Sequence, residues 1–163
     1  MNGLLIGVDG GATKTIAAVF DLDAGTVTAA ETGPSNPEAV GYEAAAASIN
    51  EAISAALGQA RPIAAAVLGV AGIDTEEERK RLLSGVTTLS APVILAVNDV
   101  VAAWAAGSLA APGIAAISGT GSNTFGVNAQ GAAWRCGGWG HIAMPWALGQ
   151  SDVGGTLPVG YGG

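Results

Sequence analysis

Two glycine-rich segments, each placed at the end of a short apolar run, limit the fold of this chain more than any other feature. The first, GVDGGATKT at residues 7–15, overlaps the apolar run 4–8, and the second, ISGTGSN at residues 117–123, ends the run 114–117. Because glycine has no Cβ atom, such turns let backbone N–H groups approach a phosphate closely. The pair Asn98-Asp99 lies between them, directly after another apolar run. This combination indicates a nucleotide-dependent phosphotransferase.

The order of apolar runs and turn signals predicts an α/β fold. The first three runs, separated by short turns, are typical of an antiparallel meander. Helices and strands then alternate, which is the pattern of a mixed sheet. The predicted elements are strands at 4–8, 15–20, 26–30, 63–70, 93–97 and 114–117, helices at 37–57, after Thr75 and at 98–106, and a hairpin at 124–127 and 132–135.

Two of the predicted helices begin with capping signals. Ser35 and Glu38 are spaced as a capping box, in which a hydroxyl and a carboxylate bond each other's backbone N–H groups. Thr75 and Glu78 repeat this spacing. We therefore expect Ser35 to cap the first helix, and we expect that helix to continue without a break to about Leu57.

Charge and cysteine content exclude several classes of protein. The 163 residues carry a net charge of −7 with only six Lys and Arg, whereas nucleic acids and anionic membranes are bound by clustered basic side chains. ATP is not excluded, because backbone amides and a metal ion can hold phosphates.

The single Cys136 provides no disulfide framework, and no basic segment of a signal peptide is present at the start, so we expect a cytoplasmic location. The uncharged stretch 100–134 is interrupted by glycine and proline and is not expected to span a membrane.

Four segments carry a resemblance to a known family. They are GVDGGATKT at 7–15, Asn98-Asp99, SGTGSN at 118–123 and GGWGH at 137–141. Their order and spacing resemble those of the BadF/BadG/BcrA/BcrD ATPase family, and within it the N-acetylglucosamine kinase-like branch. That family belongs to the sugar kinase/actin/Hsp70 superfamily. The resemblance implies a ribonuclease H-like, actin-type ATPase lobe: a mixed sheet that begins with an antiparallel three-strand meander and carries helices on both faces.

The resemblance also implies how the chain is divided. Residues 1–112 would form the ribonuclease H-like lobe that binds nucleotide and sugar, residues 113–141 would begin the second lobe, and residues 142–163 would be an irregular tail. Members of the family are roughly twice as long and follow the GGWG segment with a GDEGS motif, where this chain reads HIAMPW. We therefore expect a truncated or frame-shifted end, and we expect this chain alone to be inactive.

The two glycine turns are the predicted binding sites for the phosphates of ATP. The residues concerned are Gly10, Gly11, Ala12 and Thr13 in the first turn and Gly119, Thr120, Gly121 and Ser122 in the second. The simpler interpretation is a hairpin turn for the first and a β-turn for the second; for the first, both roles can hold together.

Asp9, at the end of the first predicted strand, is the candidate ligand for Mg²⁺, because magnesium prefers carboxylates together with phosphate oxygens. The alternative is a turn aspartate that accepts hydrogen bonds from its own backbone. Lys14 is expected to be solvated rather than directed at the phosphates.

Asp99 is the predicted catalytic residue. A carboxylate at the carboxyl end of a strand can accept the proton of a sugar hydroxyl while that oxygen attacks the γ-phosphate. The alternative is a helix cap, a position that Asn and Asp favour. By the resemblance, the residues that contact the sugar are Asn36, Asn98, Asp99 and Gly138. For Asn36, capping the helix that follows is an equally good explanation.

The resemblance implies an ATP-dependent kinase that phosphorylates N-acetylglucosamine or a related amino sugar and that uses ATP and Mg²⁺. A homodimer is compatible with the resemblance.

Other branches of the family imply the alternative of an ATPase activator for a 2-hydroxyacyl-CoA dehydratase or benzoyl-CoA reductase, which needs an iron–sulfur cluster at a dimer interface. One cysteine per subunit gives a dimer too few thiolates for that cluster. A sugar- or nucleotide-sensing module is a third candidate, although no basic helix precedes the first strand.

Overall fold

The computed structural model describes residues 3–59, 61–119 and 122–137. The chain divides into two compact units, Met1–Asp99 and Val100–Gly163, and each is described here by itself. The predicted domain ranges 1–112, 113–141 and 142–163 stay predictions.

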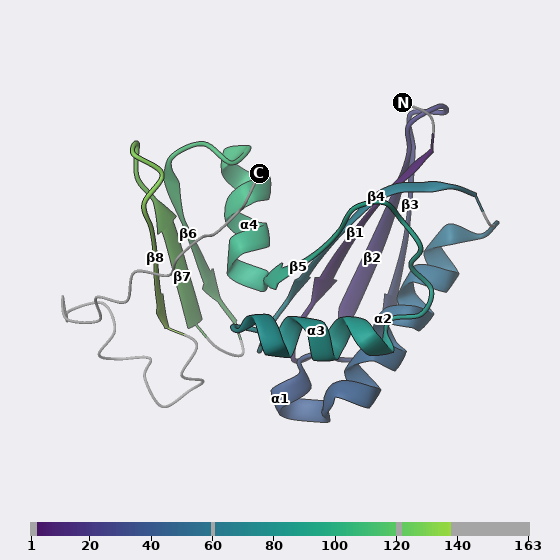
Figure 1. Ribbon diagram of the computed structural model, residues 1–163, viewed down its shortest axis with the longest axis horizontal. Helices are drawn as coiled ribbons and strands as arrows, with labels where there is room; N and C mark the ends of the chain where they lie inside the picture. The colour runs from purple at the N-terminus through teal and green to yellow at the C-terminus, as the bar shows by residue number, and fades with distance from the viewer. Residues whose placement is uncertain (1–2, 60, 120–121, 138–163) are drawn as a thin grey trace. The chain divides into compact units, whose positions relative to one another are not determined.

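The first unit contains a five-stranded mixed sheet (Figure 1). Strands β1 (Leu4–Gly10), β2 (Thr15–Asp21) and β3 (Thr26–Thr32) form the antiparallel meander that the sequence predicts. Strands β4 (Ile63–Val70) and β5 (Ile94–Asn98) continue the sheet parallel to β1. The strand order is β3-β2-β1-β4-β5, so β1 lies at the centre, between an antiparallel and a parallel neighbour.

One face of this sheet packs against helices α2 (Tyr42–Leu57) and α3 (Glu76–Gly85). Because successive side chains of a strand point to opposite faces, every second residue of β1 is buried there. Small residues let the two helices approach closely: a Cβ atom added to Gly85 of α3 would lie 2.8 Å from the Cβ of Ala46 on α2. The fully buried larger side chains of this core are Ile49, Ile53, Leu68, Val70, Ile73 and Leu82.

The opposite face of the sheet is apolar and partly exposed. Leu5 on β1, Val67 on β4 and Leu95 on β5 share this face and are 37%, 42% and 38% exposed. The resemblance implies helices on both faces; within the described part of the first unit, α2 and α3 belong to a single core on one face.

The start of the helical segment differs from the prediction in two ways. The expected cap Ser35 is not the cap; Asn36 is, as one of its two sequence interpretations has it, because its side-chain oxygen accepts the N–H of Glu38 at 2.9 Å. The predicted single helix is two helices, α1 (Pro37–Val40) and α2, which are separated by Gly41 with a φ of 82°. That left-handed conformation favours glycine and interrupts the helical hydrogen bonds. In contrast, the predicted capping box of Thr75 and Glu78 at the start of α3 is confirmed.

The second unit contains helix α4 (Asp99–Ser108) and a three-stranded antiparallel sheet. Asp99, the first residue of α4, is the last residue of the first unit. The strands of this sheet are β6 (Gly113–Ser118), β7 (Ser122–Val127) and β8 (Ala133–Gly137) in that order. The hairpin of β7 and β8 confirms the sequence prediction. A small core forms where the rings of Trp104 and Phe125 meet edge to face, with centroids 5.4 Å apart. Among the described residues, no helix has both the length and the apolar character needed to cross a membrane.

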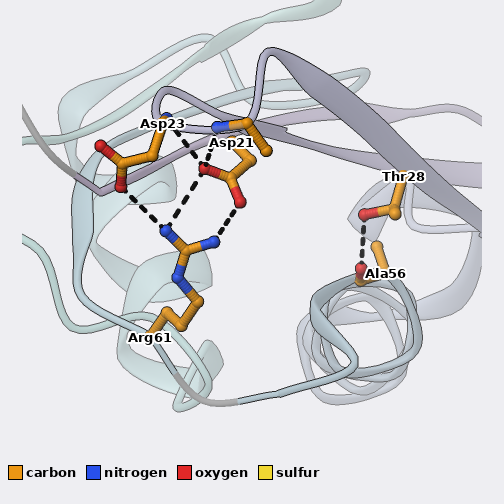
Figure 2. Close-up of polar contacts among 6 residues, drawn as sticks. Asp21, Asp23, Thr28, Ala56 and Arg61 are labelled. Carbon is orange, nitrogen blue, oxygen red and sulfur yellow. Dashed lines mark hydrogen bonds and ion pairs between the residues drawn. The ribbon is translucent and has the colours of Figure 1, made fainter.

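A charged cluster ties the β2–β3 turn of the first unit to the start of β4 (Figure 2). The Arg61 guanidinium donates to both carboxylate oxygens of Asp21 and, at 3.0 Å, to Asp23. Asp21 also accepts the backbone N–H groups of Asp23 and Ala24 at 2.9 and 3.1 Å, which closes the turn. The guanidinium, followed by the Ala24 and Asp23 N–H groups, lowers the pKa of Asp21 from 3.8 to about 2.

We expect Asp21 to contribute to the acid sensitivity of the fold. A carboxyl whose pKa is lowered on folding stabilises the native state above its unfolded pKa, and this contribution is lost as the pH falls from about 4 to about 2. Asp21→Asn should therefore flatten the decline in the free energy of unfolding over this range, as measured by chemical denaturation. Glu51→Gln, at an exposed carboxyl of α2, is the control and should keep the wild-type slope. Equal flattening in both variants would contradict this assignment.

Candidate functional site

The carboxyl ends of three parallel strands meet at one edge of the larger sheet. Gly10 at the end of β1 lies beside Val70 of β4, and Val70 lies beside Asn98 of β5. Neighbouring strands are about 4.8 Å apart, so the ends of β1 and β5 are separated by roughly 10 Å. In open α/β sheets, ligands bind outside this edge. The structure therefore brings Asp9 and the first glycine turn to the same edge as Asn98 and Asp99.

The first glycine turn is a hairpin that connects β1 to β2. The N–H of Gly11 donates to the carbonyl oxygen of Lys14 at 2.9 Å, and Ala12 and Thr13 at the tip are exposed. The hairpin interpretation is thus correct, and the exposed tip remains compatible with a phosphate-binding role. Lys14 is exposed and its Nζ pairs with a carboxylate oxygen of Glu31 at 2.9 Å, which agrees with the expected solvated role.

Gly10 is held in a position that a larger residue does not fit. A Cβ atom at this residue would lie 2.4 Å from the hydroxyl oxygen of Ser35 and 3.2 Å from a methyl group of Val70. The Ser35 hydroxyl is itself buried and lies 2.7 Å from the hydroxyl of Thr15, which also donates to the Gly33 carbonyl oxygen at 2.7 Å. The glycine turn therefore rests directly on the loop that leads into α1.

That loop is also bonded to the turn through the backbone. The carbonyl oxygen of Gly11 accepts the N–H groups of both Ser35 and Asn36, at 3.0 and 3.1 Å. Asn36, a predicted sugar contact, is consequently fixed next to a predicted phosphate contact. Asn36 thus caps α1 and also lies next to the first glycine turn.

Asn36 contacts a second loop that the sequence interpretation did not include. This loop connects β4 to α3, and its Gly72 has a φ of 76°. A Cβ atom on Gly72 would lie 2.2 Å from Oδ1 of Asn36, so the amide of Asn36 occupies the space above this glycine. Two residues further, Asp74 accepts a hydrogen bond from Nδ2 of Asn98 at 2.8 Å. The β4–α3 loop thus contacts both predicted amide ligands of the sugar.

Asn98 and Asp99 are at the junction between β5 and α4. Asn98 is the last residue of β5 and is only 6% exposed, whereas Asp99 is the first residue of α4 and is half-buried. A strand that ends in a helix start presents its last side chains at the sheet edge, which suits a carboxylate that meets a ligand there. Asp99 therefore lies directly after the carboxyl end of β5, and its catalytic role stays a prediction.

Asp9 is an exposed residue of β1 next to the glycine turn, and its role as a Mg²⁺ ligand stays a prediction. Asp74 lies in the loop after β4, and Asp99 is the first residue of α4, directly after β5. Within the described ranges, no group of three or more His, Cys, Asp and Glu side chains could hold a metal ion by itself. A single carboxylate with phosphate oxygens and water is the arrangement that Mg²⁺ commonly takes, and its charge offsets the repulsion between carboxylates and phosphates.

Several residues that build this edge were missed by the sequence interpretation. Gly72 and Asp74 have a weak local signal: glycine and aspartate after an apolar run, just before a capping box. Thr15 and Ser35 are buried polar residues whose pairing across 20 positions has no local signal at all.

The second glycine-rich segment belongs to the second unit. β6 ends at Ser118 and β7 begins at Ser122, and these two residues pair in the antiparallel register. Gly119 and Ser122 therefore flank the connection of a hairpin, and Gly119 is exposed. Thr120, Gly121 and Gly138, which the sequence also predicts as ligands, lie outside the described residues.

The sequence of this chain matches a protein family and two named kinases. Residues 6–147 match the BadF/BadG/BcrA/BcrD ATPase family. An N-acetylmuramic acid/N-acetylglucosamine kinase of Clostridium acetobutylicum is 35% identical over 143 residues, which cover 85% of this chain and 47% of the relative. An N-acetyl-D-glucosamine kinase of Dictyostelium discoideum is 32% identical over 173 aligned positions, which cover 97% of this chain and 52% of that protein.

A solved structure agrees with these sequence matches. A proposed N-acetylglucosamine kinase from Chromobacterium violaceum superposes with a TM-score of 0.68 at 27% identity, over 87% of this chain and 51% of that structure. The chain therefore spans about half the length of the curated relatives and of the solved structure that it matches.

Proposed function

The chain belongs to the BadF/BadG/BcrA/BcrD ATPase family, and on this basis we propose that it provides the sugar-binding lobe and part of the phosphate site of an ATP-dependent carbohydrate kinase. The proposed substrate class is an amino sugar such as N-acetylglucosamine, because both curated relatives are named as kinases of that sugar. Since the chain spans about half of those relatives, the activity is proposed for the whole protein and not for these residues alone.

One observation carries this proposal: the register that aligns Gly10, Val70 and Asn98 at a single edge. This register brings the glycine turn after β1 and the Asn98-Asp99 pair of β5 and α4 to one edge, and the loop that contains Asn36 is bonded to that turn through the Gly11 carbonyl oxygen. The attacking sugar hydroxyl needs a proton acceptor, and Asp99 is the proposed acceptor. The remaining hydroxyls and the N-acetyl group need hydrogen-bonding partners, and Asn36 and Asn98 are the proposed partners.

The proposed reaction is a direct transfer of the γ-phosphoryl group. The sugar hydroxyl oxygen attacks the γ-phosphorus, and the bond from that phosphorus to the bridging oxygen breaks, so that ADP leaves with the bonding electrons. The Asp99 carboxylate accepts the hydroxyl proton as the new bond forms. As the family resemblance implies, the proposed phosphate contacts are residues 10–13 and 119–122, and Gly138 is a proposed contact of the sugar.

Asp9 would hold Mg²⁺ together with phosphate oxygens and water. When bound, the ion neutralises phosphate charge and orients the phosphates. In our proposal the protein acts on small molecules, ATP and an amino sugar, in the cytoplasm and binds neither nucleic acid nor membranes; the oligomeric state stays open.

The alternative, an ATPase activator of a dehydratase or reductase, is not favoured. Such an activator needs an iron–sulfur cluster held by cysteine thiolates. Both curated relatives are named instead as sugar kinases.

The test of the proposed function is a kinase assay with the protein expressed from its complete gene. We expect ADP and a sugar phosphate of N-acetylglucosamine to form together in a Mg²⁺-dependent reaction, with the products identified by mass spectrometry. The 163-residue chain assayed alone is expected to form neither product. ADP formation without a sugar phosphate, combined with iron and sulfide in the purified protein, would overturn the proposal in favour of the activator.

A further inference from the structure

The hydrogen bond between Asn98 and Asp74 determines which way the Asn98 amide points. Its Nδ2 donates to Oδ1 of Asp74 at 2.8 Å. An ionised carboxylate only accepts hydrogen bonds, so the NH₂ group of the amide must face Asp74. The carbonyl oxygen Oδ1 of Asn98 is then turned to the other side of the amide, where it presents an acceptor and not a donor.

Asp74 is held by an element that does not belong to the sheet edge itself. Its backbone N–H donates to a carboxylate oxygen of Glu78 at 2.8 Å, and the same oxygen accepts the N–H of Thr75 at 2.7 Å. Glu78 is part of the capping box of α3, and these N–H groups lower its pKa. The position of Asp74 is therefore fixed by the first turn of α3.

These hydrogen bonds connect the β4–α3 loop to β5 and to the first turn of α3. Asp74 is exposed, whereas Asn98 is buried and directly precedes Asp99. Any hydrogen-bond acceptor at position 74 could join the loop to the strand. A carboxylate also excludes the flipped orientation of the Asn98 amide, because it cannot donate to the amide oxygen.

We propose that Asp74 is a positioning residue for the sugar: it orients the Asn98 amide so that the carbonyl oxygen accepts a hydrogen bond from a hydroxyl or N-acetyl N–H of the amino sugar. This inference rests on the proposed function and adds a residue to its sugar site. Asp74 acts through Asn98 and does not itself touch the substrate.

Asp74→Asn separates this role from a purely structural one. The new amide can still accept a hydrogen bond from Asn98, so the tie between loop and strand is kept. It can equally donate to Oδ1 of Asn98, so the Asn98 amide no longer has one preferred orientation. Glu77→Gln is the matched control, because it likewise removes one exposed negative charge, three residues further along the chain in the first turn of α3.

The experiment is steady-state kinetics of the protein expressed from its complete gene, with the melting temperature of each variant. For Asp74→Asn we expect KM for N-acetylglucosamine to rise about tenfold, with KM for ATP and the melting temperature close to wild type. Glu77→Gln should match the wild type in all three. In an Asn98→Ala background, the further substitution Asp74→Asn should leave KM for the sugar unchanged, since the partner through which it acts is gone.

The outcomes distinguish this inference from the function on which it rests. An active wild-type protein with an unchanged sugar KM in Asp74→Asn, or an equal rise in KM in the Asn98→Ala background, would overturn the positioning role alone. An inactive wild-type protein would overturn the proposed function and the sugar-directed role of Asp74 with it.

Discussion

Asp99→Asn is expected to lower kcat for amino-sugar phosphorylation at least about a hundredfold, the lower end of typical acid–base contributions. Asparagine has nearly the same shape as aspartate but cannot take the proton of the attacking hydroxyl. Because Asp99 is the first residue of α4 and is half-buried, the substitution should leave the backbone of the junction with β5 unchanged. The measurement is kcat and KM in the protein expressed from its complete gene.

The pattern of the kinetic constants separates catalysis from helix capping. If Asp99 accepts the proton, kcat falls while the melting temperature stays near wild type, since asparagine caps helices about as well as aspartate. Glu43→Gln, an exposed carboxyl in the first turn of α2, is the control and should retain wild-type kcat. Near-normal turnover of Asp99→Asn would remove Asp99 from the catalytic role.

Gly10→Ala is expected to destabilise the fold by about 1–3 kcal/mol, the usual cost of forcing an extra methyl group into a packed site. The new Cβ atom would lie 2.4 Å from the Ser35 hydroxyl oxygen and 3.2 Å from a methyl group of Val70. Ser35 could rotate away only by giving up its contact with Thr15, and both residues are fully buried. A buried hydroxyl without a partner itself costs about 1–3 kcal/mol. Chemical denaturation of the two proteins measures the difference.

The same strand provides the control for Gly10→Ala. Gly7 lies on the exposed face of β1 with no atom within 4 Å of an added Cβ, so Gly7→Ala should be neutral or slightly stabilising. In a Ser35→Ala background, which removes the hydroxyl, Gly10→Ala should cost less than it does in the wild type. Equal destabilisation in both backgrounds would show that the contact between residues 10 and 35 is not the cause.

The sequence predicts those parts of the fold that depend on neighbouring residues. The three-strand meander follows from apolar runs and the turns between them, and the capping box of α3 needs only Thr75 and Glu78 at the correct spacing. The family resemblance drawn from four short motifs is confirmed by the match over residues 6–147. Asn36 was a better cap than Ser35 because Ser35 is used in a distant contact with Thr15.

What the sequence did not predict depends on contacts between distant segments. The break between α1 and α2 depends on the left-handed backbone conformation of Gly41, which glycine permits but does not require. The roles of Gly72 and Asp74 become visible only when the sheet places the β4–α3 loop next to Asn36 and Asn98, the second of which lies 24 positions from Asp74. The predicted phosphate contacts of the two glycine turns stay predictions.

The row of Gly10, Val70 and Asn98 has a consequence for how this protein matures. Sliding the ladder between β4 and β5 by one residue would turn Asn98 to the opposite surface of the sheet, away from Val70 and Asp74. The alignment of these strands is therefore a condition that must be met during folding before the proposed sugar contacts can form.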